Sequence, residues 1–337
     1  MREIAVLGGG SWGTALAIQA ARAGCSVNLW VRDAELAGRI DSERENSKYL
    51  PGHSLPDSVK VTADMGDVAD LALALVVVPS HGFRQVIDRF LETKRGSGPV
   101  ILVSATKGIE QESTFRMSQV VEAVAREHGC TAGFAVLAGP SFAVELAASQ
   151  PTAAVIAAAD VDLAQELGEL LSTPRCRLYS ATDVVGVELG GAGKNVIAIG
   201  AGIVSGLDLG HNTLAALITR GLHEITRLGV ACGGDARTFS GLAGLGDLVL
   251  TCTGGLSRNR RTGLELAAGK SLQQIEEETS MVAEGIRNSV SLTRLATRRD
   301  IEMPITQQMM AVMYEGKPPT QAVEELMTRA LKAEAEL

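Results

Sequence analysis

The sequence predicts an N-terminal α/β domain with a doubly wound sheet, followed by an all-α C-terminal domain. Three observations carry this prediction. The chain has 337 residues, more than one hydrophobic core usually holds. Short β-prone runs alternate with helical segments in the first half, and only helical periodicity continues from about residue 184. Apolar residues make up 46% of the chain but aromatic residues only 3%, so aliphatic side chains must fill the interior, as in a parallel sheet covered by helices.

Six short apolar runs indicate the strands of the first domain. They span 4–7, 26–31, 71–78, 100–105, 134–138 and 152–157. Helical segments are predicted at 11–23, 33–45, 115–127, 141–148 and 163–171. Because strand–helix–strand connections are right-handed crossovers, we expect the strands to be parallel.

The second half contains helical patterns and no strand-like run. We expect helices over 192–203, 214–229, 264–267, 289–298, 305–314 and 319–331. The change of character near residues 180–184 predicts two domains, 1–182 and 183–337.

Charge, cysteine content and the N-terminal sequence exclude several classes of protein. The net charge is −8, and the one dense basic cluster, 258–261, is too small to coat a nucleic acid. The five cysteines have no CxxC pair, which argues against a disulfide framework and structural zinc. The chain enters an apolar run at once without a signal-peptide pattern, and its longest apolar run, 71–79, is too short to span a bilayer. We therefore expect a cytoplasmic protein with no membrane insertion and no nucleic-acid partner.

A glycine motif at the first strand predicts dinucleotide binding. Residues 8–13 contain Gly8, Gly10 and Gly13 in the spacing GxGxxG, after an apolar strand and before an alanine-rich helix. Gly8 would form the tight turn, Gly10 would admit a pyrophosphate, and Gly13 would let the helix pack on the strand. The N–H groups at the start of that helix would bind the pyrophosphate. This context predicts a Rossmann-like domain.

The end of the second predicted strand bears on the choice between NADP and NAD. An arginine there accepts a 2′-phosphate, whereas an acidic residue binds ribose hydroxyls. The sequence offers both, Arg32 and then Asp33. Asp33 either favours NAD or caps the following helix. We expect NADP(H) to be preferred, with NAD(H) possible.

Two lysines are candidates for the acid–base group that hydride transfer to a carbonyl requires. The five histidines show no metal-binding spacing, and we expect no metal site. Lys107 follows a strand at the end where parallel sheets bind ligands. Lys194 is a single charge on an apolar, glycine-rich helix, where an ammonium requires a partner. Asp247, also in an apolar run, is the carboxylate that would orient it.

A short basic segment predicts a phosphate receptor. Residues 257–261 read Ser-Arg-Asn-Arg-Arg, and arginine matches the geometry of phosphate oxygens. A small phosphorylated ketone or alcohol is therefore the expected substrate.

The motifs together carry a family resemblance. The chain resembles the bacterial NAD(P)-dependent glycerol-3-phosphate dehydrogenases along essentially its whole length. The matching segments are 8–17, 76–81, 105–109, 138–143, 188–197, 241–253, 257–261 and 282–285. The resemblance implies interconversion of dihydroxyacetone phosphate and sn-glycerol 3-phosphate, a product that feeds glycerophospholipid synthesis, and a homodimer.

The resemblance also implies roles for individual residues. Lys194 matches the proton acceptor, with Lys107 and Asp247 beside it in the catalytic set. The implied cofactor contacts are Ser11, Trp12, Arg32, Tyr49, Lys107, Ala143, Arg258, Val282 and Glu284. The implied substrate contacts are Lys107, Gly139, Ser141, Lys194, Asp247, Ser257, Arg258 and Asn259. The chain departs from the family at Asp33, where a second basic or polar residue is common, and this leaves the preference for NADP open.

Two other functions fit parts of the sequence. Reductases of the β-hydroxyacid or 6-phosphogluconate dehydrogenase type also place a lysine on a glycine-rich helix, but 246–248 and 257–261 favour the glycerol phosphate enzymes. A non-catalytic NAD(P)-sensing protein would keep the fold alone. The joint presence of Lys107, Lys194 and Asp247 argues against it.

Overall fold

The computed structural model describes residues 2–96, 98–278, 283–331 and 333–334, which fold into two compact units. Unit 1 comprises Met1–Lys107 and Phe115–Val184. Unit 2 comprises Gly108–Thr114 and Val185–Leu337, so a segment from the first half of the chain packs with the second.

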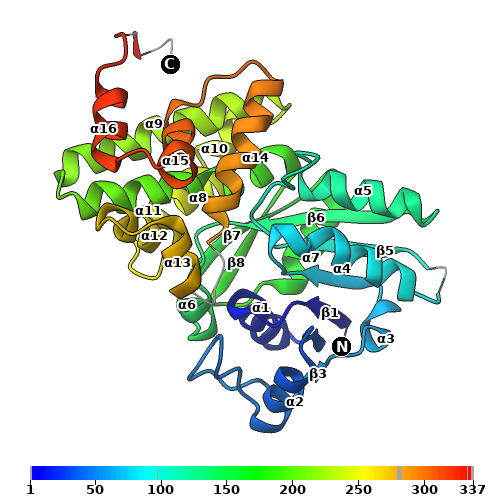
Figure 1. Ribbon diagram of the computed structural model, residues 1–337. Coiled ribbons are helices and arrows are strands. Elements are labelled where there is room, and N and C mark those ends of the chain that lie inside the picture. Colours follow the sequence, from blue (N-terminus) through cyan, green and yellow to red (C-terminus); the bar gives the residue numbers. More distant parts are fainter. Residues whose placement is uncertain (1, 97, 279–282, 332, 335–337) are drawn as a thin grey trace. The chain divides into compact units, whose positions relative to one another are not determined.

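Unit 1 contains an eight-stranded sheet in the order β3-β2-β1-β4-β5-β6-β7-β8 (Figure 1). The strands are β1 (Glu3–Leu7), β2 (Ser26–Trp30), β3 (Val59–Thr62), β4 (Leu73–Val76), β5 (Val100–Ser104), β6 (Ala132–Ala138), β7 (Thr152–Ala158) and β8 (Cys176–Ala181). The helices are α1 (Ser11–Arg22), α2 (Ala34–Glu43), α3 (Gly66–Ala69), α4 (Ser80–Thr93), α5 (Met117–Glu127), α6 (Ala143–Ala147) and α7 (Val161–Leu171). The first six positions of the sheet have the strand order of dinucleotide-binding domains, which confirms the predicted fold class.

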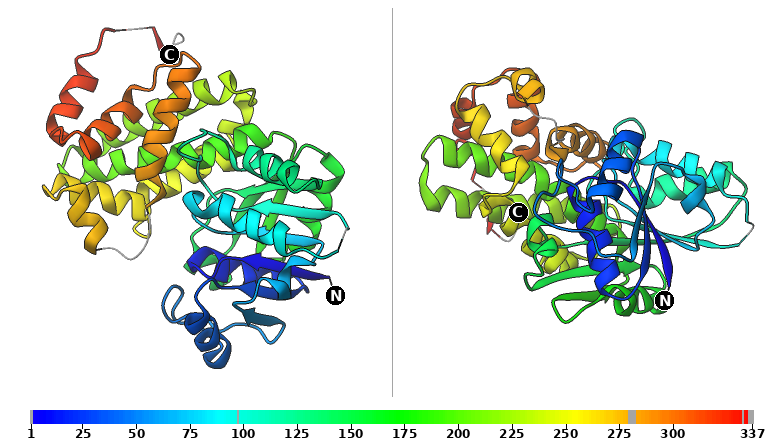
Figure 2. Two further views of the ribbon diagram at one scale, coloured as in Figure 1. Left: turned by 45° about the vertical axis from the view of Figure 1, so that its right-hand side comes forward. Right: turned by 90° about the horizontal axis from the view of Figure 1, so that it is seen from below.

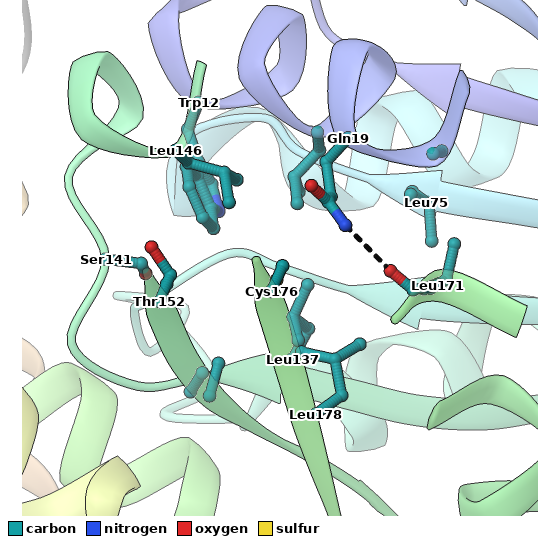
Figure 3. A pocket seen from close by; sticks show the side chains of 14 residues that line it. Trp12, Gln19, Leu75, Leu137, Ser141, Leu146, Thr152, Leu171, Cys176 and Leu178 are labelled. Atoms are coloured by element: carbon teal, nitrogen blue, oxygen red, sulfur yellow. Dashed lines mark hydrogen bonds between the residues drawn. The ribbon is translucent and has the colours of Figure 1, made fainter. Parts of the chain in front are cut away.

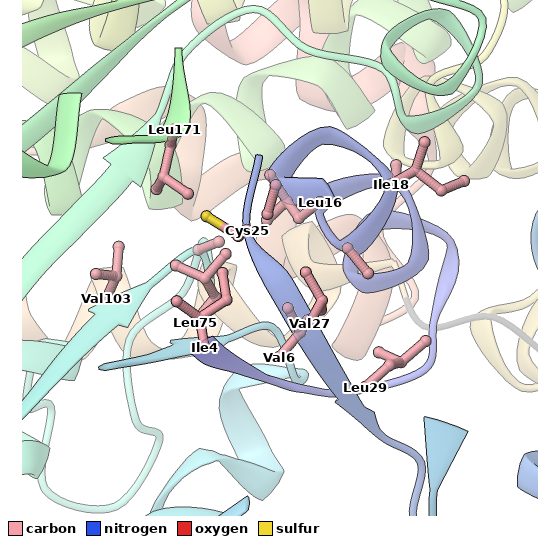
Figure 4. Packing of buried hydrophobic residues seen from close by; sticks show 14 of the residues in the cluster. Ile4, Val6, Leu16, Ile18, Cys25, Val27, Leu29, Leu75, Val103 and Leu171 are labelled. Carbon is pink, nitrogen blue, oxygen red and sulfur yellow. The ribbon is translucent and has the colours of Figure 1, made fainter. Parts of the chain in front are cut away.

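Side chains of successive residues in the central strands enter different cores. On β1, Ile4 and Val6 belong to the core that α1, α2, α6 and α7 cover (Figure 4), whereas Ala5 and Leu7 belong to the core under α3, α4 and α5. This follows from the period of two along a strand, and it explains why both kinds of position are apolar. The glycine loop after β1 therefore stands on a strand that is buried on both faces.

Three features of unit 1 differ from the sequence prediction. One strand pair is antiparallel, β6 with β7, whereas all other pairs are parallel as expected. Two strands were not predicted, because β3 has four residues and β8 carries exposed polar residues and Tyr179. Helices α3 and α4 were also missed. Helix α3 has only four residues, whereas Phe83, Ile87, Phe90 and Leu91 give α4 a periodic buried face.

Unit 2 is helical, and its described residues contain no strand, as predicted (its helices run from green through yellow to red in Figure 2). Its elements are α8 (Val184–Gly206), α9 (Gly210–Ala231), α10 (Ala236–Phe239), the π-helix η1 (Leu242–Gly246), α11 (Asp247–Thr253), α12 (Arg258–Ala267), α13 (Leu272–Glu278), α14 (Glu284–Arg298), α15 (Pro304–Tyr314) and α16 (Pro319–Met327). Helix α8 is long and apolar enough to cross a membrane, but its apolar window is entirely buried inside the structure. Lys194 projects from this buried helix.

Candidate active site

Several predicted site residues of unit 1 lie at one edge of its sheet. Strands β1, β2, β4, β5 and β6 run parallel, so their carboxyl ends share an edge. Gly8 follows β1, Arg32 follows β2, Lys107 follows β5 and Gly139 follows β6. Ligands of open parallel sheets bind at this edge, where the strand order reverses.

The glycine loop combines two steric requirements with one open position. Gly8 has φ +128°, and a Cβ there would lie 2.3 Å from the Val77 carbonyl oxygen. A Cβ on Gly13 would lie 1.8 Å from the carbonyl oxygen of Gly8, so only glycine lets α1 pack this closely. By contrast, a Cβ on Gly10 would meet nothing within 4 Å.

The N-terminus of α1 suits an anionic group. Gly10 is its N-cap residue, and no side chain caps this end. Helices α2, α7, α10 and α12 each have an Asp or Ser side chain in that role. The open space at Gly10 and the uncapped helix end fit a dinucleotide pyrophosphate.

Ser11, Trp12 and Tyr49 lie around the first turn of α1. The Ser11 hydroxyl donates a hydrogen bond to the Tyr49 carbonyl oxygen at 2.6 Å. The Lys48 ammonium lies 5.2 Å from the centroid of the Tyr49 ring. The Trp12 indole lines a small apolar cavity of about 20 Å³. Figure 3 shows Ser141 and Thr152 below the indole, at the same end of this cavity.

The structure assigns a local role to Asp33. Its carboxylate caps α2 by accepting hydrogen bonds from the backbone N–H groups of Glu35 and Leu36 at 3.0 and 3.1 Å. These bonds hold the pKa of Asp33 below its usual value. Arg32 is exposed and makes no hydrogen bond or ion pair with the described residues. Of the two readings of Asp33, the structure therefore supports the helix cap.

Lys107 and Ser141 meet at one carbonyl group. The Lys107 Nζ donates to the Gly139 oxygen at 3.2 Å, and the Ser141 hydroxyl donates to the same oxygen at 2.9 Å. Ala143, half-buried, begins α6 nearby in sequence. Both polar side chains thus lie with Gly139 at the carboxyl end of β6.

A buried lysine is the centre of the site in unit 2. Lys194 is only 6% exposed, and its Nζ donates to Asp247 Oδ1 at 2.5 Å and to Thr251 Oγ1 at 2.7 Å. Asp247 is 1% exposed and begins α11 directly after the π-helix η1, a type of irregularity that is frequent at functional sites. The Thr251 hydroxyl donates to the Asp247 backbone oxygen at 2.6 Å. The ammonium therefore has a charged and a neutral acceptor.

The basic segment after α11 has one arginine open for an anion. Arg258 is exposed, and its guanidinium makes no hydrogen bond with the described residues. Arg260 donates to the Ser205 hydroxyl at 3.2 Å, and Arg261 pairs with Glu265 at 3.2 Å. Of the three arginines in the predicted receptor, Arg258 is thus the one whose side chain has no hydrogen-bond partner among the described residues.

Family models match both halves of the chain. The family model for the NAD-dependent glycerol-3-phosphate dehydrogenase N-terminus matches residues 3–164, and the model for the C-terminus of that enzyme matches residues 183–324. The chain belongs to the NAD-dependent glycerol-3-phosphate dehydrogenase family. This confirms the resemblance drawn from the motifs.

Individual relatives match over nearly the full length. The glycerol-3-phosphate dehydrogenase [NAD(P)+] of Solidesulfovibrio magneticus is 48% identical, covering 98% of this chain and 100% of that protein. The protein of that name from Geobacter sulfurreducens is 50% identical, covering 98% of each. The crystal structure of glycerol-3-phosphate dehydrogenase from Coxiella burnetii has a TM-score of 0.92 at 41% identity and covers 97% of this chain and 99% of that one.

Two of the predicted substrate contacts also have structural roles in this chain, one as a helix cap and one in contacts between helices. Ser257 caps α12 by accepting from the Arg260 N–H at 3.2 Å. The buried Asn259 donates to Asn195 Oδ1 and accepts from the Gly285 N–H, each at 2.9 Å. These contacts hold α12 against α8 and the start of α14.

The last predicted cofactor pair is only partly described. Glu284 is the first residue of α14 and is half-buried. Val282 lies outside the described residues.

Sequence reasoning missed Thr251 and Asn46. Thr251 is four residues after Asp247 on α11, a spacing that places both side chains on one helix face. Asn46 lies in a loop, where no periodic pattern identified it, although it is completely buried.

Proposed function

We propose that this chain catalyses the reversible reduction of dihydroxyacetone phosphate to sn-glycerol 3-phosphate with NAD(P)H. The observation that carries this proposal is the buried ammonium of Lys194, held by Asp247 and Thr251. Reduction of a ketone produces an alkoxide, which requires a proton donor at that oxygen. Membership of the glycerol-3-phosphate dehydrogenase family supports the choice of substrate.

The proposed mechanism assigns one half of the chemistry to each unit. The nucleotide, when bound at the glycine loop of unit 1, supplies the hydride. Lys194 donates a proton from Nζ to the forming alkoxide oxygen and accepts it back in the reverse direction. Asp247 stabilises the ammonium and directs it, while Lys107 adds positive charge toward the developing oxyanion. Asp247 thereby acts on the reaction through Lys194.

The phosphate of the substrate is assigned to Arg258. Its guanidinium makes no hydrogen bond with the described residues, so its N–H groups are available to phosphate oxygens. Ser257 and Asn259 flank it and keep the first turn of α12 in place. Holding the phosphate away from the reacting carbon fixes the orientation of the ketone, and such alignment contributes several kcal/mol in well-organised sites.

We propose that NADP(H) is preferred over NAD(H). The exposed guanidinium of Arg32 suits a 2′-phosphate. The carboxylate of Asp33 is bound to two backbone N–H groups, and the charges of Lys48 and Arg39 act on it as well. These groups offset the repulsion that a free carboxylate would exert on the phosphate.

We also propose that the chain is a cytoplasmic homodimer, the homodimer being what the resemblance of its motifs implies. Light scattering combined with gel filtration measures the mass in solution directly. A mass near twice the 35.2 kDa of one chain is expected.

The test is a matrix of initial rates. NADPH and NADH are each oxidised with dihydroxyacetone phosphate, and NADP+ or NAD+ is reduced with 6-phosphogluconate or a β-hydroxyacid. We expect turnover only with the triose phosphate, and a higher kcat/KM for NADPH than for NADH. Turnover of 6-phosphogluconate or the β-hydroxyacid would move the chain to another class of reductase. Nucleotide binding without any turnover would make it a sensor.

A further inference from the structure

We propose that Asn46 is a positioning residue that holds the glycine loop in the conformation that binds the pyrophosphate of the dinucleotide. The residues assigned above touch the ligands, whereas Asn46 acts through the loop. The inference rests on the proposed nucleotide site.

Asn46 is completely buried in the segment between α2 and β3, and both the nitrogen and the oxygen of its carboxamide form hydrogen bonds. Its Nδ2 donates to the Gly9 carbonyl oxygen at 2.9 Å and to the Thr14 hydroxyl at 2.8 Å. Its Oδ1 accepts from the Tyr49 N–H at 3.2 Å. Both amide hydrogens are therefore bound within the protein, and Asn46 has none to offer to a ligand.

The bond to Gly9 fixes the direction of a neighbouring N–H group. The carbonyl of Gly9 and the N–H of Gly10 belong to one planar trans peptide unit, in which they point in opposite directions. By holding the Gly9 oxygen, Asn46 turns the Gly10 N–H away from itself. Gly10 is the loop position where an added Cβ would meet nothing within 4 Å.

A second contact fastens the same segment to α1. The Ser11 hydroxyl donates to the Tyr49 carbonyl oxygen at 2.6 Å. With Asn46 on Gly9 and Thr14, residues 46–49 thus hold the loop and the first turn of α1 from one side. This arrangement orders the loop while leaving the helix end without a side-chain cap.

Replacement of Asn46 should therefore lower the affinity for the nucleotide. Glycine peptides have wide conformational freedom, so a released Gly9–Gly10 unit samples orientations that do not bind. Affinity falls in proportion to the fraction of molecules in the competent conformation. The chemical step, which Lys194 performs in unit 2, is not expected to change once the nucleotide is bound.

The experiment compares Asn46→Ala with Asn28→Ala. Asn28, on β2 in the same unit, is 9% exposed and donates one side-chain bond, to Glu3. NADPH binding is titrated by the fluorescence of Trp12 and Trp30, without ketone, and kinetics and thermal unfolding follow. We expect Asn46→Ala to raise the Kd for NADPH by about tenfold or more, with kcat at saturating NADPH and the KM for the ketone within threefold of wild type. Asn28→Ala should leave the Kd within about twofold.

An unchanged Kd in Asn46→Ala, with a lowered unfolding temperature, would assign Asn46 a purely structural role and overturn the proposal. If Asn46→Ala does not fold, Thr14→Val decides. It removes one acceptor at nearly constant shape, and the Kd should rise about threefold or more. A wild-type Kd in Thr14→Val would then refute the proposal. Failure of wild-type protein to bind NADPH would refute the nucleotide site itself, which separates the two hypotheses.

Discussion

The Nζ of Lys194 and the Oδ1 of Asp247 lie 2.5 Å apart, and both side chains are almost fully buried. Removing two charges from water costs several kcal/mol per ion, and their attraction offsets this only while both are present. A pair of this kind is weak evidence for stability. It is better explained by the need for an ammonium at this position of α8.

The ion pair therefore predicts non-additive stability. Asp247→Leu leaves a buried ammonium without its counter-ion, and Lys194→Met leaves a buried carboxylate without its counter-ion. Each substitution should therefore lower the free energy of unfolding by about 3–5 kcal/mol. The double variant should be more stable than either single variant, which urea unfolding of all four proteins measures. Additive losses would contradict the pairing.

The glycine loop predicts opposite behaviour for two alanine substitutions. Gly10→Ala places its methyl group in open space at φ −81°, so the protein should fold with nearly unchanged stability but bind NADPH at least about tenfold more weakly. Gly13→Ala forces a methyl group against the Gly8 carbonyl and should destabilise unit 1. Calorimetry and NADPH titration distinguish the two effects. Normal NADPH affinity in Gly10→Ala would contradict the placement of the pyrophosphate.

Arg32 predicts a change in cofactor selectivity. Arg32→Ala removes a guanidinium from the 2′-phosphate and should raise the KM for NADPH by about tenfold or more, the usual effect of losing a bond to a charged group. The KM for NADH should change little, since NADH lacks that phosphate. Arg177→Ala, at an exposed arginine on β8, is the matched control. Equal changes for both nucleotides would remove Arg32 from this role.

The buried side chain of Glu224 leads us to predict that the stability of the protein depends on pH. It is 1% exposed and accepts hydrogen bonds from the N–H groups of Ile305 and Thr306 at the start of α15. Burial raises its pKa from 4.5 to about 7. Because the pKa of Glu224 is higher in the folded state than in the unfolded state, the protonated form of Glu224 stabilises the fold. This contribution to the free energy of unfolding is complete below the pKa of Glu224 in the unfolded chain, and it is lost as the pH rises through about 7.

The measurement for Glu224 is the free energy of unfolding at pH 5 and pH 8, in wild type and Glu224→Gln. The wild type should lose up to about 3 kcal/mol more than the variant between these pH values. A difference between the two proteins that does not change with pH would show that Glu224 does not titrate in this range.

The sequence predicted the parts of the structure that have strong local signals. The buried strands β1, β4 and β5 are continuous apolar runs, and GxGxxG directly precedes a helix, so both were recognisable. Strand β8 was missed because an edge strand alternates with exposed residues such as Tyr179. The antiparallel pairing of β6 with β7 depends on tertiary packing, which no local pattern encodes.

The same distinction applies to the site. Lys194 was conspicuous because a charge interrupts an apolar helix. The sequence could not decide between the two alternative roles of Asp33, because a helix cap and a ribose contact both need a carboxylate after a strand. Asn46 gave no signal, because only the folded chain brings it to Gly9. The Ser257 cap, by contrast, has a common sequence signature and was still assigned only to substrate.

The most direct test of the account is the turnover of Lys194→Ala with NADPH and dihydroxyacetone phosphate, measured together with the Kd for NADPH. Loss of the proton donor should lower kcat by at least about a hundredfold, while nucleotide affinity in unit 1 stays within about twofold. A kcat within a few-fold of wild type would contradict the assignment of Lys194 as the acid–base group.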